Sequence, residues 1–253
     1  KALCSLLAVA VLAACGSSST VDPFKPTRVI GLGDAYNDTS NAQYTVRGTT
    51  QTITTVVAQV AALYGAATVE SHASSAYAST VDLMTQINQL GSLSDTADLV
   101  VITAGTKEFI GGADPTGANY LNTLKSALDA LKRKGAKHIV IMEVVDLSLM
   151  GVGFADPITF NSTVKAGLTA YTDVARYGNI NRPSAFFPGW ATSGVRTPFC
   201  VSPGTHDGCD FTEAGNATGD VSTYFLADNL NPTPAGNQWL GQQLYLVTGG
   251  GWR

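Results

Sequence analysis

Charge is scarce in this chain of 253 residues. Only 13% of the residues are charged, the formal net charge is −4, and there are three histidines. The lysines and arginines form no long basic run and no cluster with aromatic residues, which argues against nucleic acid as a partner. No proline- or serine-rich linker interrupts residues 28–250, so we expect a single domain with one large core.

The chain also lacks an apolar run long enough for a stable membrane span. Its apolar stretch at residues 6–12 follows the basic Lys1 and ends in small residues before Cys15, which resembles a bacterial lipobox. We expect residues 1–14 to be a signal peptide, Cys15 to carry lipid, and residues 15–26 to form a flexible tether. The alternative is an ordinary secretory signal with an incidental cysteine. The lipobox interpretation predicts a lipid-anchored protein of the bacterial cell envelope, bound to the outer membrane.

Cysteines are few: four in all, of which Cys4 lies in the signal and Cys15 would carry the lipid. Cys200 and Cys209 remain, and in an exported chain two such residues in one loop are most simply a disulfide. The rival interpretation is a zinc site that adds His206 and Asp207. We expect the disulfide, and neither a metal nor a cofactor.

Within residues 27–253, apolar runs alternate with segments of helical periodicity, which is typical of an α/β protein with a parallel sheet covered on both faces. The expected strands are residues 28–33, 67–71, 98–104, 137–145 and, more weakly, 185–187. Apolar helix faces are expected at Ile53, Val56, Val60 and Leu63, at Leu121, Leu124, Leu128 and Leu131, at Phe160, Val164, Leu168 and Tyr171, and at Trp239, Leu240 and Leu244.

Residues 177–227 fit this alternation poorly because they are rich in Gly, Pro, Ser and Thr. We expect a long excursion over the mouth of the sheet, held by a disulfide between Cys200 and Cys209. An exposed apolar patch in this excursion would favour a protein partner. The residues available for such a patch are Phe186, Phe187, Trp190 and Phe199.

The most informative stretch is residues 33–38, Gly-Asp-Ala-Tyr-Asn-Asp, directly after an apolar strand. With serine in place of Ala35 it would resemble the first block of the SGNH/GDSL esterase and lipase family. Residues 98–109 resemble the third block, with Lys107 at the position of the oxyanion-hole asparagine. Residues 228–236 resemble the fifth block, Asp-x-x-His-Pro-Thr, with Asp228 retained and Asn231 in place of the general-base histidine.

The second block is placed at residues 71–76, where Ser74 or Ser75 replaces the glycine whose amide assists the oxyanion. The resemblance extends from about residue 28 to residue 243. It implies the flavodoxin-like, three-layer α/β/α fold of the SGNH hydrolases, with a parallel sheet of about five strands.

Ester hydrolysis in this family requires a hydroxyl nucleophile and an imidazole base. Ala35 cannot attack, and the amide of Asn231 is far too weak a base near neutral pH. We therefore expect a non-catalytic binding or envelope protein. One alternative is an esterase that acts through displaced residues, in which His72 would pair with Ser40, Thr39, Ser74 or Ser75. Another is a scaffold for a protein partner.

The polar residues at or beside these family positions would form a ligand pocket for an unidentified small molecule or protein. Alternatively, Lys107 pairs with Asp228 or Asp34 and fills an abandoned cleft. The carboxylates lack the Asp-x-Asp spacing of a divalent-cation loop, so no metal is expected. The predicted pocket consists of Asp34, Ala35, Asp38, Lys107, Glu108, Asp228 and Asn231.

Overall fold

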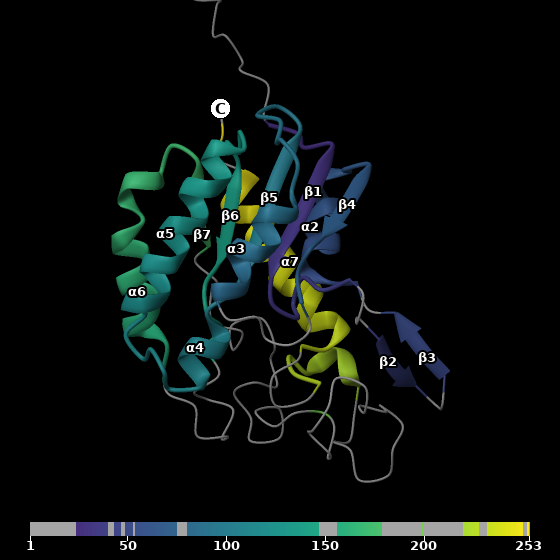
Figure 1. The fold of residues 1–253 in the computed structure, drawn as a ribbon. Helices are drawn as coiled ribbons and strands as arrows, with labels where there is room; N and C mark the ends of the chain where they lie inside the picture. The colour runs from purple at the N-terminus through teal and green to yellow at the C-terminus, as the bar shows by residue number, and fades with distance from the viewer. Residues whose placement is uncertain are drawn as a thin grey trace, which may run out of the picture.

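A five-stranded, entirely parallel sheet forms the centre of the molecule, with the strand order β4-β1-β5-β6-β7 (Figure 1). The computed structural model describes residues 24–39, 43–46, 49–52, 54–74, 80–146, 156–178, 199, 220–227, 232–249 and 252. The strands are β1 Arg28–Gly33, β4 Thr68–Ser71, β5 Asp98–Thr103, β6 Ile139–Met142 and β7 Ala175–Gly178. This confirms the predicted α/β class.

The three inner strands are continuous apolar runs because both of their faces are covered. Every residue of β5 and β6 is buried, and only Arg28 of β1 is partly exposed. Alternate side chains therefore enter two separate cores. In β1, for example, Val29 belongs to one core, whereas Ile30 and Leu32 belong to the other.

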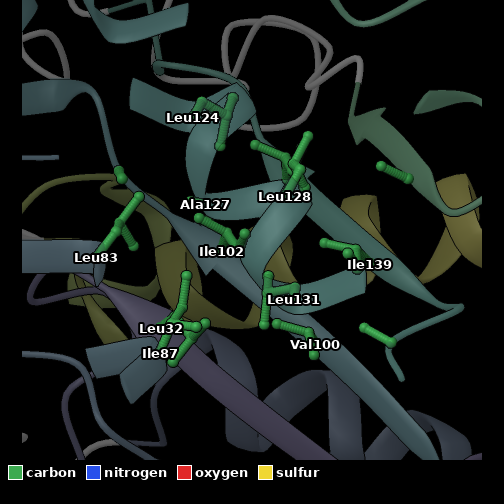
Figure 2. Packing of buried hydrophobic residues seen from close by; sticks show 14 of the residues in the cluster. Leu32, Leu83, Ile87, Val100, Ile102, Leu124, Ala127, Leu128, Leu131 and Ile139 are labelled. Atoms are coloured by element: carbon green, nitrogen blue, oxygen red, sulfur yellow. The ribbon is translucent and has the colours of Figure 1, made fainter. Parts of the chain in front are cut away.

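Helices cover both faces of the sheet and complete three layers (Figure 1). α2 and α7 pack against each other on one face, and α3, α5 and α6 lie on the other. Figure 2 shows the second core, where Leu124, Leu128 and Leu131 of α5 meet residues of β1, β5 and α3. The helices are α2 Val56–Tyr64, α3 Thr80–Gln89, α4 Thr106–Ile110, α5 Ala118–Arg133, α6 Ile158–Gly167 and α7 Pro234–Gly249, with short 3-10 turns η2 Thr169–Tyr171 and η5 Val221–Thr223.

Three details differ from the sequence-based expectation. The fifth strand is β7, which follows α6 directly, whereas the expected strand at 185–187 lies outside the described residues. A small antiparallel ribbon, β2 Gln43–Val46 and β3 Thr49–Thr52, was not predicted. Leu63 was assigned to the apolar face of α2 but is 40% exposed, because it lies in the last turn of that helix, near the edge of the layer.

Of the expected excursion at 177–227, the structure describes only residues 177–178, 199 and 220–227. Phe199 is buried and its ring meets Tyr224 edge-on, with the centroids 5.1 Å apart. Phe199 therefore does not contribute to an exposed apolar patch, and the other three candidates for that patch, Phe186, Phe187 and Trp190, lie outside the described residues. Cys15, Cys200 and Cys209 lie outside the described residues. No helix in the described part is both long and apolar enough to cross a membrane.

Candidate functional site

The loop after β1 leaves the sheet at a topological switch point. β1 lies between β4 and β5, so the crossover from β1 leads to one neighbour and the next crossover leads to the other. In open α/β sheets, ligands bind outside the carboxyl ends of the strands at such a point. Residues 34–38 therefore occupy the position in this fold that is best suited to a binding site.

Gly33 brings this loop against the end of β5. Its φ is +108°, and an added Cβ would lie 1.7 Å from the carbonyl oxygen of Thr103, so no other residue fits without backbone movement. The next amide, Asp34 N–H, donates to that same carbonyl at 2.7 Å. Gln86 of α3 bonds both backbone groups of Gly33, at 2.6 and 2.9 Å. The start of the loop is thus fixed by contacts with β5 and α3.

Asn37 fixes the far end of the loop. Its side-chain amide is fully buried and donates to the carbonyls of Leu32 and Val101, both at 3.0 Å. The backbone carbonyl of Asn37 accepts a hydrogen bond from the hydroxyl of Ser71 at 2.6 Å. The carbonyl of Tyr36 accepts from the first amide of α2, so the loop also anchors that helix.

Ala35 is the only residue from Gly33 to Asp38 that is partly exposed, and the others in this loop, including Asp38, are buried. The side chain that the loop presents is therefore a methyl group, at the position that the family resemblance assigns to the nucleophile. None of the described residues accepts a hydrogen bond from the Ala35 N–H. This amide is consequently available as a hydrogen-bond donor to a ligand.

Asp34 is 1% exposed, and burial raises the pKa of its carboxyl group to about 7. The charge of Glu108 adds to this shift, whereas Thr103 and the Tyr36 amide, which donates to Asp34 Oδ1 at 3.2 Å, oppose it. The hydroxyl of Thr103 nevertheless makes no hydrogen bond of ordinary geometry, and Asp34 Oδ2 has no partner among the described residues. Near neutral pH the carboxyl group is thus poised between its two protonation states.

Two further buried oxygens belong to this neighbourhood and were not predicted. Thr103 ends β5 and Tyr120 lies on the buried side of α5, and neither hydroxyl has a described partner. Burial, with the nearby charges of Glu108 and Asp34, raises the pKa of Tyr120, so its ring stays neutral. Both residues occupy ordinary core positions in the sequence pattern, and no local motif distinguishes them.

Lys107 and Glu108 follow β5 on the short helix α4. Lys107 is exposed, Glu108 is partly buried, and no ion pair joins Lys107 to Asp34. The alternative in which Lys107 pairs with Asp34 is therefore not seen, because Asp34 is buried while the lysine is exposed, and its pairing with Asp228 stays an alternative because Asp228 lies outside the described residues. An exposed lysine here offers a cation to a ligand at the surface.

The second block approaches β1 through backbone bonds. Ser74 N–H donates to the carbonyl of Gly33 at 3.1 Å, so this amide is not free to bind an oxyanion, and Ser75 lies outside the described residues. His72 does not pair with a described hydroxyl, since its ring nitrogens face Glu70 at 2.6 Å and Gln89 at 3.1 Å. A displaced base at His72 therefore has a carboxylate and an amide as neighbours rather than a nucleophile.

The fifth block is brought to the same end of the sheet. Thr233 is fully buried, its hydroxyl donates to the carbonyl of Tyr224 at 2.7 Å, and it accepts from Gly236 N–H at 3.0 Å. Phe225 and Leu226 share a core cluster with Tyr36 of the first block. Asp228 and Asn231 themselves lie outside the described residues, so their place in the predicted pocket remains an expectation.

The other described histidine, His138, precedes β6 at the opposite end of the sheet. It stacks on Phe24, and burial lowers its pKa, so it has a packing role away from the loop at residues 33–38. No three His, Cys, Asp or Glu side chains of the described part gather closely enough to hold a metal ion.

No protein-family model matches the sequence, and no curated protein matches it either. Solved structures resemble the fold. A member of the lipolytic protein G-D-S-L family from Veillonella parvula superposes with a TM-score of 0.50 and 14% identity, covering 85% of this chain and 94% of that one. Phospholipase A1 from Streptomyces albidoflavus superposes with a TM-score of 0.48 and 20% sequence identity, and the match covers 87% of this chain and 97% of that one. A catalytic mutant of an acetylxylan esterase from Geobacillus stearothermophilus superposes with a TM-score of 0.47 and 16% sequence identity, and the match covers 85% of this chain and 91% of that one. The chain therefore has an SGNH/GDSL hydrolase-like fold.

Proposed function

We propose that this chain is an exported, lipid-anchored envelope protein whose SGNH/GDSL hydrolase-like domain binds a ligand rather than hydrolysing an ester. The observation that carries the proposal is the exposure of Ala35. The loop at the switch point buries its polar side chains and presents only a methyl group. A methyl group cannot form the covalent intermediate on which the hydrolytic reaction depends.

The remaining groups favour binding. The N–H of Ala35, which has no acceptor among the described residues, and the exposed side chain of Lys107 on α4 are both donors, and they follow two strands whose ends Asp34 and Thr103 hold together. Donors of this kind suit a ligand that carries a carboxylate or another oxygen-rich group. Asp228 and Asn231 complete the proposed pocket.

The positions of the two described histidines support the same proposal. His138 lies at the far end of the sheet, and His72 is held by Glu70 and Gln89. In hydrolases of this type, loss of either the nucleophile or the base costs several orders of magnitude in rate. The esterase alternative would need a third arrangement, built from residues outside the described ranges.

A fluorophosphonate probe, which labels only an activated serine, tests the proposal. We expect no labelling of the unmodified chain or of Ala35→Ser, because the latter gains a hydroxyl but no base. The triple change Ala35→Ser, Lys107→Asn and Asn231→His restores three family positions, so weak labelling is expected if the backbone has kept the cleft. Labelling of the unmodified chain at any serine would overturn the proposal in favour of a displaced nucleophile.

The proposed anchor is tested separately. Replacing Cys15 by serine should abolish lipid labelling and release the protein from membranes, and unchanged membrane fractionation would contradict the anchor. Gly16 after the cysteine resembles the sorting pattern for the outer membrane, which density-gradient fractionation checks. The proposed disulfide predicts a non-reduced peptide that joins Cys200 and Cys209 in mass spectrometry.

A further inference from the structure

The end of the sheet opposite Ala35 carries a second surface feature. A cavity of about 210 Å³ lies there, and four of its lining side chains are aromatic: Phe24, Tyr64, Tyr245 and Trp252. Phe24 lies just before β1, whereas Tyr64 and Tyr245 belong to the last turns of α2 and α7. In Figure 1 this is the end marked C, and α4 with the candidate site lies at the other. We call these four residues, with Lys25, Leu63 and Leu246, the amino-end surface.

Exposed leucines occur near the ends of both helices that line the cavity. Leu63 is 40% exposed and lines it, and Leu246, which follows Tyr245 on α7, is 68% exposed. Only two other large hydrophobic residues in the described part are comparably exposed, Val69 and Ile158. Leu63 adds exposed apolar area to the aromatic cavity, and Leu246 adds a second exposed leucine near the same end of α7.

The aromatic rings of this surface are held in place by one another. Phe24 stacks on His138 with centroids 3.6 Å apart, and Trp252 meets both rings edge-on. Tyr64 packs against Tyr245 at 4.8 Å, and its hydroxyl donates to Thr248. Because these contacts fix the rings before any partner arrives, binding would cost little ordering entropy.

Cations flank the same rings. Lys25 lines the cavity and is exposed, and the guanidinium group of Arg176 lies 5.5 Å from the centroid of the Trp252 ring. No acidic side chain lines the cavity. Trp252 is only 7% exposed and supports the other rings from beneath. Tyr, Lys and exposed Leu are residues that proteins use at the headgroup level of a bilayer, where amphipathic rings lie between water and lipid and lysine reaches the phosphates.

We infer that the amino-end surface rests on a phospholipid bilayer. The inference builds on the proposed lipid anchor, because the segment from Cys15 to Phe24 spans at most ~30 Å when fully extended and so keeps this end of the domain near the membrane. Leu63 and Leu246 then enter the interface, and Lys25 faces the phosphates. The candidate site around Ala35 points away from the bilayer, where it can meet a ligand in the aqueous compartment.

Hydroxyl-radical footprinting of the full-length protein, with and without vesicles of phosphatidylethanolamine and phosphatidylglycerol, tests the inference. We expect several-fold slower oxidation of Leu63, Tyr245 and Leu246 on vesicles and no change at Ile158, which is 56% exposed on α6. Unprotected leucines on a protein that cosediments with the vesicles would overturn the inference while leaving the anchor intact. A protein that does not associate with vesicles would overturn it as well.

Variants sharpen the result. The double change Leu63→Asp and Leu246→Asp should remove the protection at Tyr245 while the lipid keeps the protein on the vesicles, whereas the matched control Ile158→Asp should retain it. A melting curve establishes that each variant folds. If the same residues are protected without vesicles, and more so at higher protein concentration, this surface binds a second copy of the chain. That result would overturn the inference that it rests on a bilayer.

Discussion

Asp34 and Thr103 are joined by their backbones but not by their side chains. The amide of Asp34 donates to the carbonyl of Thr103 at 2.7 Å, while Asp34 Oδ2 and Thr103 Oγ1 are both buried with no hydrogen-bond partner in the part of the chain that the structure describes. The backbone contact brings together the loops after β1 and β5, and the carboxyl group is enclosed as a consequence. The candidate site is therefore assembled at the expense of a buried acid whose pKa is raised to about 7.

This burial makes the stability of the fold depend on pH. The folded state holds the Asp34 proton up to about pH 7, whereas an unfolded chain releases it near 3.8, so stability falls as pH rises between these values and is level above them. Asp34→Asn removes the titration and should exceed the parent in stability by ~2–4 kcal/mol at pH 8, but by much less at pH 5. Urea unfolding at both pH values checks this. The exposed Asp129→Asn is the control, and an Asp34→Asn advantage independent of pH would contradict the burial argument.

Gly33→Ala should be strongly destabilising. The backbone is left-handed there, and the new Cβ would meet the carbonyl oxygen of Thr103 at 1.7 Å. The conformational penalty alone is about 1–2 kcal/mol, and the clash with a carbonyl on the neighbouring strand adds to it. Gly91→Ala, where no atom lies within 4 Å of the added Cβ, is the matched control and should melt close to the parent. Equal melting temperatures for the two variants would show that the loops are not in contact here.

The ion pair between Asp98 and Arg28 stabilises the other end of the sheet, where β1 and β5 begin. Burial would raise its pKa, but hydrogen bonds from Arg28 at 2.6 and 2.9 Å and from the Ser94 amide outweigh that effect and lower it. Asp98→Asn should therefore cost roughly 2 kcal/mol at pH 7. The lowered pKa of Asp98 means that the difference from the parent should shrink as the pH falls below 3.8, the ordinary value for an aspartate. Chemical denaturation across this range measures it. Asp173→Asn, which breaks the exposed pair with Lys132, should cost much less, and equal losses would contradict the argument.

The fold could be predicted where apolar periodicity alone determines the structure. Buried parallel strands are unbroken apolar runs, so β1 and β5 are visible in the sequence. β7 is not, because Ala175–Gly178 is short and two of its residues, Arg176 and Tyr177, are only partly buried. The helix faces were predicted for the same reason as the strands, with two exceptions: Leu63 is exposed at the end of a layer, and Tyr171 lies in the 3-10 turn η2 rather than in α6. Ile53 lies outside the described residues.

The candidate site could be predicted only in part. Motifs placed the loop at residues 33–38, and the structure brings it next to the third block through Asp34 and Thr103. Motifs do not record which side chains the loop encloses. The enclosure of Asp34, the solvent exposure of Lys107 and the contribution of Tyr120 depend on how α4 and α5 cross the end of the sheet, and residue spacing carries no information about that crossing.

Turnover of short-chain p-nitrophenyl esters by the unmodified protein tests the central claim most directly. Because the loop at the switch point presents the methyl group of Ala35, hydrolysis should stay at the background rate across pH 5 to 9 in every purification fraction. The account would be contradicted by ester hydrolysis that follows the protein through purification and disappears in His72→Ala, because that result would assign the reaction to a displaced base.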